Sequence, residues 1–467
     1  MLDVSSKDIT EGSLGRALAF LSVPIVAQQL ALVAQQVIDV FWIGRLGEDQ
    51  VAAVGLVMPL LGLFAAGTMA VFLGGQIVVS QRVGADDLPG SRRAAFHALV
   101  GAGVVGLLLA GVVNAFALDI TQLFQPGDRV AQLGAIYLGT MVLSYTFSGM
   151  SDAMEAAFVG SGDSRTPLVV NLVAIVVNVV LDPILMFGMW RFDAYGIAGA
   201  AYATLVAYAV GLLIALGVAL SGRGGFTLTR NAVGIDVDEF RALLDVGAPK
   251  AAQESGRQIA RLVMVSIISV TGGGAALAAY TVGARISTVA FVPAIGLGSA
   301  GTTLVGQNLG ADRPDRATRA TWLGVGVGAV GVGVLGIVQW FVPGFLAEVF
   351  VPGIEGETLE YTIAYLQILA LGYWALGAIY TVEAGFNGAG RTSISMYSTM
   401  LQYWTVRIPV AAVLAFGLGY GAHGPFWAVT VSNVVAAVGL CAYFRYSTDN
   451  GMLDRAATSS CGADAAD

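Results

Sequence analysis

The sequence is poor in charged residues, cysteine and histidine. Only 12% of its 467 residues are Asp, Glu, Lys or Arg, about half the fraction of an average soluble domain, and this excludes a soluble enzyme. The two cysteines, Cys441 and Cys461, give neither a disulfide framework nor a metal pattern. The two histidines, His97 and His423, stand alone and lack metal-ligand spacing. We therefore expect no enzymatic activity and no cofactor.

Lysine is nearly absent as well. Lys7 and Lys250 are the only lysines, and the net charge is −8. Because the chain has no basic patch, nucleic acid is not an expected partner. The run Gly272-Gly273-Gly274 is not followed by Lys-Ser or Lys-Thr, as a phosphate-binding loop requires. We interpret it as a turn between two membrane spans.

Long apolar runs are abundant. The chain is 56% hydrophobic, and runs of about 20 apolar residues, enough to cross a bilayer, recur along it. Glycine is also frequent, with 62 residues, as close helix packing in lipid favours. The sequence predicts an all-α membrane protein with twelve transmembrane helices. The candidate spans are 15–43, 51–80, 94–118, 131–159, 167–189, 197–220, 242–270, 276–306, 318–343, 359–386, 393–418 and 424–445.

These spans divide the chain into two lobes. We predict an N-lobe of six spans over residues 1–222, a cytoplasmic linker over 223–241 and a C-lobe of six spans over 242–446. Residues 447–467 are expected to form a polar, disordered tail. The first twelve residues are polar and the first apolar run is long enough to span, so no cleaved signal is expected.

The loop charges predict the orientation. With the N-terminus inside, sixteen Arg and Lys residues fall in inner segments, and three, Arg45, Arg129 and Arg191, fall in outer loops. Positive loop residues concentrate on the cytoplasmic side of membrane proteins. We therefore predict a multi-pass protein of the plasma membrane with both termini in the cytoplasm.

The two halves of the chain repeat each other. The segment Gln81–Asp86 matches Gln307–Asp312, and Glu155–Gly162 matches Glu383–Gly390. Further pairs are Pro24 with Pro249, Gln28 with Gln253, Pro183 with Pro409, and Gly196 and Gly199 with Gly421 and Gly424. Because each half has an even number of spans, the repeats are predicted to be parallel and to enclose a central cavity.

Asn178, Asp182 and Pro183 form a polar patch inside the apolar run 169–189. A carboxylate inside a membrane costs roughly 2.5–3.5 kcal/mol on insertion scales, so it needs a partner or a function. Asn178 lies one helical turn before Asp182, and Pro183 cannot donate a backbone hydrogen bond. This combination favours a proton or small-cation site. The alternative is a polar clamp between helices.

Span 1 carries a polar face of its own. Gln28, Gln35 and Asp39 are spaced by seven and four residues, and Gln36 is also one turn from Asp39. Polar residues on one face of an apolar helix indicate a cavity. Hydrogen bonding between helices is the alternative.

Span 4 holds a second acidic pair. Asp152 and Glu155 are one turn apart on one face. Two carboxylates this close in a low dielectric suit a proton carrier. Glu155 can instead stabilise helix packing near the inner end of the span, as its repeat partner Glu383 indicates.

The order and spacing of the motifs resemble the multidrug and toxic compound extrusion (MATE) family over residues 15–445. The N-lobe pattern is most similar to the DinF-like branch. The resemblance implies export of amphipathic organic compounds in exchange for inward H+ or Na+. It is carried by Leu21-Ser22-Val23-Pro24, Asp39, Trp42–Gly47, Ala52–Gly55, Gly160–Asp163, Asn178 with Leu181-Asp182-Pro183, and Gly199–Thr204.

The resemblance also implies a cation site in the N-lobe. Asp39 and Asp182 match its two acidic positions, Asn178 and Thr204 match its neutral oxygen ligands, and Tyr137 matches a tyrosine beside it. Asp152 replaces an Asn that is frequent in this branch, which adds a negative charge to the predicted site. No metal is expected beyond Na+ at this site. The secondary candidates are Gln36, Glu155, Glu254 and Glu383.

The C-lobe differs in its chemistry. Trp404 and Ile408 stand at the positions of Asn178 and Asp182. Glu254 lies three residues before Arg257, so an internal ion pair is the first interpretation, and a NorM-like Na+-binding acid is the alternative.

Other side chains within the spans allow more than one interpretation. Arg285 and Arg407 are expected to be paired or to bind backbone carbonyls. Met and aromatic residues can line an adaptable drug pocket or face lipid. These are Met186 and Met189 in the N-lobe and Phe386, Tyr397, Tyr403 and Trp404 in the C-lobe.

The leading functional hypothesis is a monomeric, cation-coupled antiporter that exports amphipathic, cationic compounds by alternating access. The N-lobe spans carry acids and no Arg or Lys, which favours cationic substrates. A lipid-linked oligosaccharide flippase of the same superfamily is the alternative, because such proteins use basic side chains, and Arg257 and Arg261 lie within a span.

Overall fold

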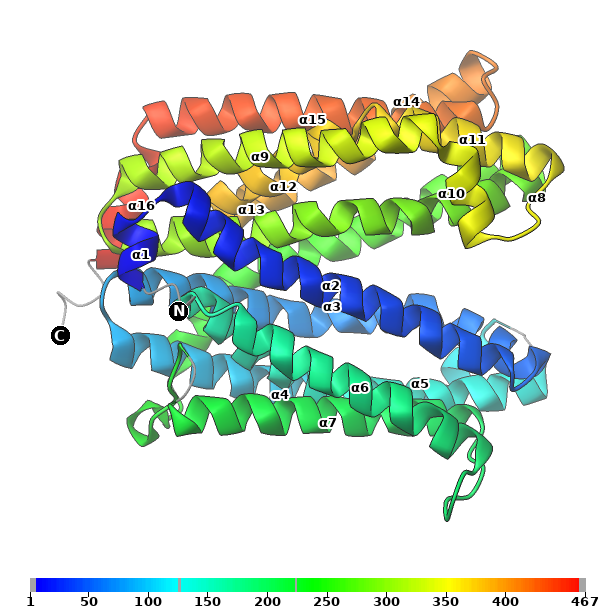
Figure 1. The fold of residues 1–467 in the computed structure, drawn as a ribbon, viewed down its shortest axis with the longest axis horizontal. Coiled ribbons are helices and arrows are strands. Elements are labelled where there is room, and N and C mark those ends of the chain that lie inside the picture. Colours follow the sequence, from blue (N-terminus) through cyan, green and yellow to red (C-terminus); the bar gives the residue numbers. More distant parts are fainter. Residues whose placement is uncertain (1–5, 125–126, 223–224, 462–467) are drawn as a thin grey trace. The chain divides into compact units, whose positions relative to one another are not determined.

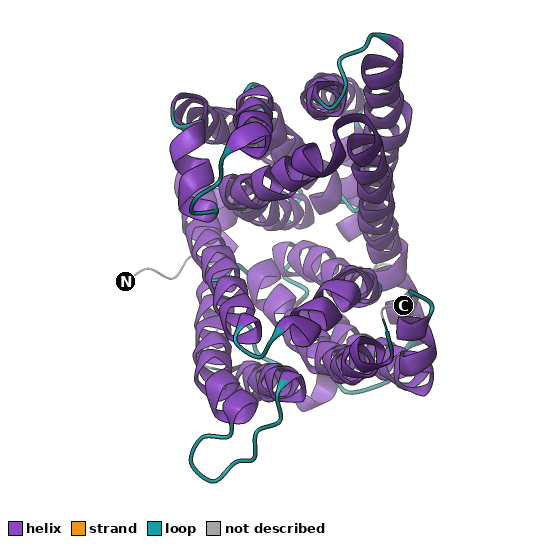
Figure 2. Ribbon diagram, turned by 90° about the vertical axis from the view of Figure 1, so that its right-hand side faces the viewer, coloured by secondary structure: helices purple, strands orange, loops and turns teal. Residues whose placement is uncertain are grey.

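The computed structural model describes residues 6–124, 127–222 and 225–461. Within these ranges the chain consists of helices and loops, without strands (Figures 1 and 2). In the described part, nine helices are long and apolar enough to cross a membrane. Helices α11 and α12 together form a further candidate span that is bent by 50°.

The N-lobe helices coincide with the first six predicted spans. Helix α1 (Ser6–Glu11) precedes them and is short. The six helices are α2 (Leu14–Gly44), α3 (Glu48–Gly84), α4 (Leu88–Gln122), α5 (Asp128–Ser161), α6 (Arg165–Phe187) and α7 (Ile197–Ser221).

The next two predicted spans are the two halves of α8 (Val237–Gly310). The halves meet at Gly273, whose φ of 61° and ψ of −157° break the helix. A residue with a side chain rarely adopts this backbone conformation. The predicted glycine turn is therefore confirmed.

The last four spans complete the C-lobe. All twelve predicted spans are therefore helical, six in each repeat, with α8 supplying two of them. Span 11 is irregular, since two of its segments, η2 and η3, have wider turns than an α-helix. The elements are α9 (Pro314–Phe341), α10 (Pro343–Phe350), α11 (Gly356–Ala370), α12 (Tyr373–Gly388), α13 (Thr392–Met400), η2 (Leu401–Arg407), α14 (Ile408–Ala412), η3 (Val413–Gly417) and α15 (His423–Asp449).

The repeat is visible in the backbone as well as in the sequence. Asp86 and Asp312 both have a positive φ, of 61° and 54°, at the turns after α3 and α8. Gly160 and Gly388 also match, because a Cβ at either would lie 2.7–2.8 Å from a carbonyl oxygen, of Gln76 or Thr302. The two lobes thus use the same turns and the same close helix contacts.

The chain folds into two compact units whose boundaries differ from the predicted ones. Residues 7–26 belong to the second unit, and the chain up to Ala251 belongs to the first. The contacts explain this, since Asn308 and Arg313 donate to the carbonyl groups of Ile9 and Thr10. Leu243, near the start of α8, is buried in the first unit's core.

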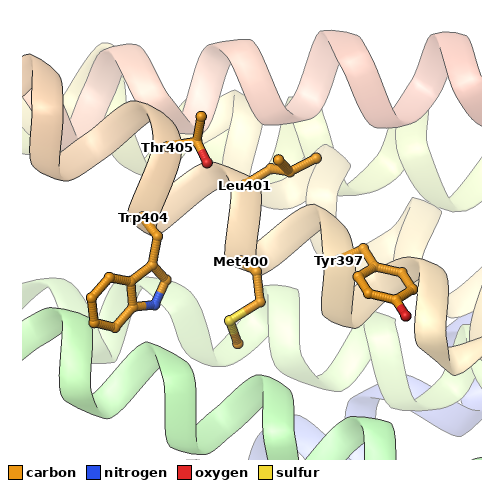
Figure 3. Close-up of a pocket in the computed structure, with 5 residues that line it drawn as sticks. All are labelled: Tyr397, Met400, Leu401, Trp404 and Thr405. Atoms are coloured by element: carbon orange, nitrogen blue, oxygen red, sulfur yellow. The ribbon is translucent and has the colours of Figure 1, made fainter.

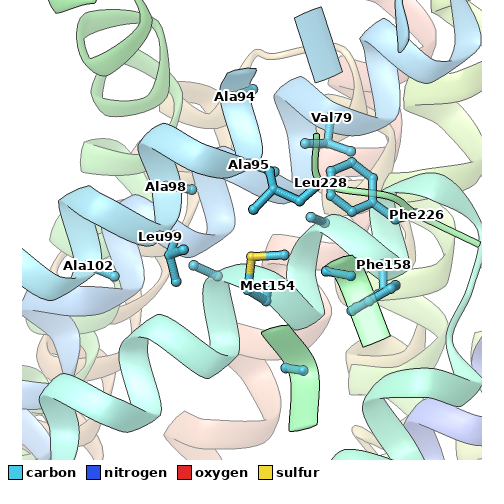
Figure 4. Packing of buried hydrophobic residues seen from close by; sticks show 14 of the residues in the cluster. Val79, Ala94, Ala95, Ala98, Leu99, Ala102, Met154, Phe158, Phe226 and Leu228 are labelled. Atoms are coloured by element: carbon cyan, nitrogen blue, oxygen red, sulfur yellow. The ribbon is translucent and has the colours of Figure 1, made fainter. Parts of the chain in front are cut away.

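The linker packs tightly against the N-lobe. Phe226 and Leu228 lie in the core beside Phe158 and the small residues of α4 (Figure 4). A 3-10 turn, η1 (Arg230–Ala232), follows. Arg82 pairs with Glu239, in the first turn of α8, at 2.9 Å. Apolar contacts thus hold the segment before α8, and an ion pair holds the start of this helix.

The prediction of a disordered tail is wrong for its described part. Helix α15 continues to Asp449, and a further helix, α16, spans Met452–Cys461. Met452, Leu453 and Ala456 are buried, and α16 packs against α9 and α15. The apolar residues recur at helical spacing and cover one face. Residues 462–467 lie outside the described residues.

Candidate functional site

Asp39 on α2 and Asp182 on α6 meet in the N-lobe. Their carboxyl groups are close to each other, and Asp182 is only 2% exposed. An ionised carboxylate only accepts hydrogen bonds, so two such groups this close repel each other unless a proton or a cation lies between them. Asp39 Oδ1 and Asp182 Oδ2 are buried and have no hydrogen-bond partner among the described residues.

An amide and a hydroxyl complete this acidic site. Asn178 Nδ2 donates to Asp182 Oδ1 at 3.3 Å and to Thr204 Oγ1 at 3.4 Å. Thr204 in turn donates to the carbonyl of Ala200. Asn178 therefore presents its nitrogen to the carboxylate. The family resemblance had instead implied that the side-chain oxygen of Asn178 is a ligand of the cation. The helical spacing of four residues places Asn178 and Asp182 on one face.

Gln35 links this network to α2. Its Nε2 donates to Asn178 Oδ1 at 2.6 Å. The predicted secondary candidate Gln36 is exposed, and no described hydrogen bond joins it to the site. The face containing Gln35 and Asp39 is therefore the one that turns towards α6, because packing sets the rotation of the helix.

Tyr137 lies beside the acidic pair, as predicted. It is on α5, is 4% exposed and is close to both Asp39 and Asp182. Five of the six predicted coupling residues, Asp39, Asp182, Asn178, Thr204 and Tyr137, thus lie together.

Asp152 belongs to a second acidic cluster with Glu155. Ser148 donates to Asp152 at 3.2 Å, and the Asp152 carboxylate is close to that of Glu155. Tyr208 on α7 lies near both Asp152 and Asp39. Tyr208 therefore lies between Asp152 and the Asp39–Asp182 pair. The hydrogen-bond partner of Asp152, Ser148, is on α5.

Glu155 is held by donors from three helices. Gln28 on α2, Ser151 on α5 and Asn171 on α6 all donate to its carboxylate. The prediction omitted Asn171, which lies in the second turn of α6. The arrangement stabilises the contact between these helices.

The C-lobe repeats this second cluster. Gln253 donates to Glu383 at 3.1 Å, and Thr399 donates to the same carboxylate at 3.4 Å. Gln253 and Glu383 are the repeat partners of Gln28 and Glu155. Since both lobes hold a glutamate in this way, a packing role fits both positions.

Glu254 forms the predicted internal ion pair. Its carboxylate lies 3.5 Å from Arg257 and accepts from Gln258 at 2.8 Å. In the part of the chain that the structure describes, no three His, Cys, Asp or Glu side chains gather as they would around a metal ion. A cation at the N-lobe site would need neutral oxygens in addition to the two carboxylates.

Known proteins resemble the chain over most of its length. The MatE family model matches residues 24–184 and 254–413, one stretch in each repeat. The chain is 27% identical over 408 residues to the probable multidrug resistance protein YoeA of Bacillus subtilis, covering 86% of this chain and 87% of that protein. It is 28% identical over 454 residues to the probable multidrug resistance protein NorM of Pseudomonas aeruginosa, covering 93% and 89%.

A solved structure shares the fold. An outward-facing multidrug resistance MATE family transporter of the MOP superfamily superposes with a TM-score of 0.90 at 20% identity, covering 97% of this chain and 99% of that one. The assignment to the DinF-like branch stays a prediction. The family-model match spans both lobes, and the chain therefore belongs to the MatE family.

Proposed function

We propose that the protein exports amphipathic organic compounds in exchange for an inward-moving cation that binds at Asp39 and Asp182. The observation that carries the proposal is the contact between these two carboxyl groups, each with one buried oxygen that has no hydrogen-bond partner among the described residues. A proton or a small cation satisfies both. Buried carboxylates inside a membrane span are typical of such pathways.

Of the two cations, H+ is favoured slightly over Na+. Na+ prefers several oxygen ligands, and Asn178 presents its nitrogen to Asp182. A single shared proton needs no further ligand. Na+ would compete for the same two carboxylates and for the hydroxyl of Thr204.

Cation binding can drive the transport cycle through charge. It removes negative charge from the buried pair and lowers the cost of keeping the site closed to water. If one conformation of the protein packs better with a neutral pair, cation binding shifts the population towards that conformation. Pro24 interrupts the backbone hydrogen bonding of α2, and we place the bend of this helix there.

The acidic N-lobe favours cationic amphiphiles as substrates. Two relatives are named probable multidrug resistance proteins, which supports small organic compounds over a lipid-linked oligosaccharide. The flippase alternative is therefore less favoured. We propose that the protein acts as a monomer in the plasma membrane.

The test is a flux assay in proteoliposomes. A lipophilic cation such as ethidium is loaded, and a pH gradient or a Na+ gradient is applied separately. Asp39→Asn and Asp182→Asn should abolish gradient-driven export, while Glu254→Gln and Glu383→Gln should be milder. Normal export by both Asp variants, with loss in a Glu variant, would place the coupling in the C-lobe and contradict the proposal.

A further inference from the structure

The C-lobe contains a buried arginine whose described partners are neutral. Arg407, at the end of η2, is 7% exposed. Its Nε donates to Ser432 Oγ at 2.8 Å, its Nη2 donates to Asn433 Oδ1 at 2.6 Å, and its guanidinium lies 3.8 Å from the ring centre of Tyr403. The expectation of an ionic or backbone partner is wrong for this residue, because hydroxyl, amide and aromatic groups hold it.

This arrangement orients a positive charge without neutralising it. Among the described residues no carboxylate forms an ion pair with Arg407. A charge inside a membrane span is costly and usually faces a ligand or a water-filled cavity. The wider helical turn of η2 is also a feature that occurs often at functional sites.

Two further arginines lie within electrostatic range of the same tyrosine. Arg257 and Arg261, like Arg407, interact with Tyr403 through their charge. Arg257 pairs with Glu254, but its Nε is buried and has no hydrogen-bond partner in the described chain. Arg261, one turn later on α8, is exposed.

The acids nearby do not balance these charges. Glu383 is also near Arg257, yet its carboxylate is already bound by Gln253 and Thr399. Three guanidinium groups therefore face two carboxylates, and the cluster keeps a positive charge.

An apolar pocket adjoins this cluster. Tyr397, Met400, Leu401, Trp404 and Thr405 line a concavity of about 520 Å³, and Met400 and Trp404 point towards α8 in Figure 3. Gly256, the residue before Arg257, provides the close approach, since a Cβ there would lie 2.7 Å from Met400 Sδ and 3.9 Å from Trp404 Nε1. Met and aromatic side chains adapt to varied apolar ligands.

The repeat makes the difference between the lobes clear. Trp404 and Ile408 occupy the positions of Asn178 and Asp182, so the equivalent C-lobe helix carries the apolar pocket and Arg407 in place of the acidic site. Equivalent elements thus present negative charge in one lobe and positive charge in the other.

We propose that Arg257, Arg261 and Arg407 form a subsite for the carboxylate of an aromatic substrate, whose ring system lies in the pocket of Tyr397, Met400 and Trp404. A guanidinium can bind a carboxylate through two parallel hydrogen bonds. The proposal rests on the proposed export function only in identifying this ligand as cargo.

The experiment measures binding to the purified full-length protein in lipid nanodiscs by calorimetry, with empty nanodiscs as blank. Three probes share one ring system and differ in charge: 1-naphthaleneacetate, its methyl ester and 1-naphthylmethylamine. We expect the anion to bind at least tenfold more tightly than the ester. Equal affinity of anion and ester, or tighter binding of the amine, would overturn the subsite.

Variants separate charge from the apolar pocket. Arg261→Gln and Arg407→Gln should each weaken anion binding at least tenfold and leave ester binding unchanged. Arg261 is exposed, so its variant tests the subsite even where the loss of buried Arg407 prevents folding. Trp404→Ala should weaken all three probes by a similar factor. Unchanged anion binding in folded Arg261→Gln and Arg407→Gln proteins would contradict the assignment.

Asp182→Asn distinguishes this proposal from the proposed function. It should abolish gradient-driven ethidium export and leave naphthaleneacetate binding intact. Normal anion binding by a wild-type protein that exports nothing would contradict the transport proposal and support the subsite. Export by a protein that does not bind the anion selectively would contradict the subsite and support the transport proposal.

Discussion

Gln35 Nε2 donates to Asn178 Oδ1 at 2.6 Å, and this bond joins α2 to α6 within the N-lobe. Both residues are buried, at 7% and 0% exposure. Because the oxygen of Asn178 is occupied by Gln35, its nitrogen is directed at Asp182. Gln35 therefore determines which group of Asn178 the acidic pair meets.

Gln35→Leu should impair cation-coupled export. It leaves Asn178 Oδ1 buried without its donor, at a cost of about 1–3 kcal/mol, and it frees the amide to rotate. We expect the initial rate of gradient-driven ethidium export to fall by about an order of magnitude, with the protein still in the membrane. Gln36→Leu is the matched control, because Gln36 is exposed. Equal rates for both variants would exclude the positioning role of Gln35.

Protons and Na+ should compete at the acidic pair. Protonation of Asp39 or Asp182 removes the negative charge that Na+ requires, so lowering the pH should weaken Na+ binding. The unfolding temperature of the purified protein is measured with and without Na+ at several pH values, both below and above neutrality. The quantity of interest is the rise that Na+ causes at each pH. The rise should shrink towards acid pH and be absent in Asp182→Asn. A rise that is independent of pH, or that persists in this variant, would place Na+ elsewhere.

Glu155→Leu should destabilise the protein more than Glu155→Gln. Leucine removes the acceptor of Gln28, Ser151 and Asn171. The buried hydroxyl of Ser151 then lacks its partner, at about 1–3 kcal/mol, whereas glutamine retains one acceptor oxygen. We expect the unfolding temperature in detergent to fall in the order Glu155→Gln, then Glu155→Leu, and Glu383 variants to behave alike. A Glu155→Gln protein of normal stability that no longer transports would instead identify a proton carrier.

The acidic pair and the repeat were predictable because their signals are strong. A carboxylate such as Asp182 in an apolar run has few roles, and turns such as Gln81–Asp86 and Gln307–Asp312 share four of their six residues at the same positions. The choice between Gln35 and Gln36 was not predictable, since both lie close to Asp39 along the helix. Only packing against α6 decides which of them faces inward.

The linker and tail show another limit. Phe226 and Leu228 are isolated apolar residues in a polar segment, and Met452 and Leu453 begin a helix of only ten residues. Periodicity cannot separate such short patterns from loops. Their burial depends on surfaces that distant helices provide.

The orientation can be tested at one loop on each side of the N-lobe. In a Cys441→Ala, Cys461→Ala background, a cysteine at Asp193 should react with an impermeant maleimide in intact cells, and a cysteine at Ser221 should react only after permeabilisation. Both positions are exposed, and they lie at opposite ends of α7 (Ile197–Ser221). The expectation rests on the excess of Arg and Lys in the predicted inner segments. The reverse pattern would invert the topology and place both termini outside, whereas labelling of both positions in intact cells would show that α7 does not cross the membrane.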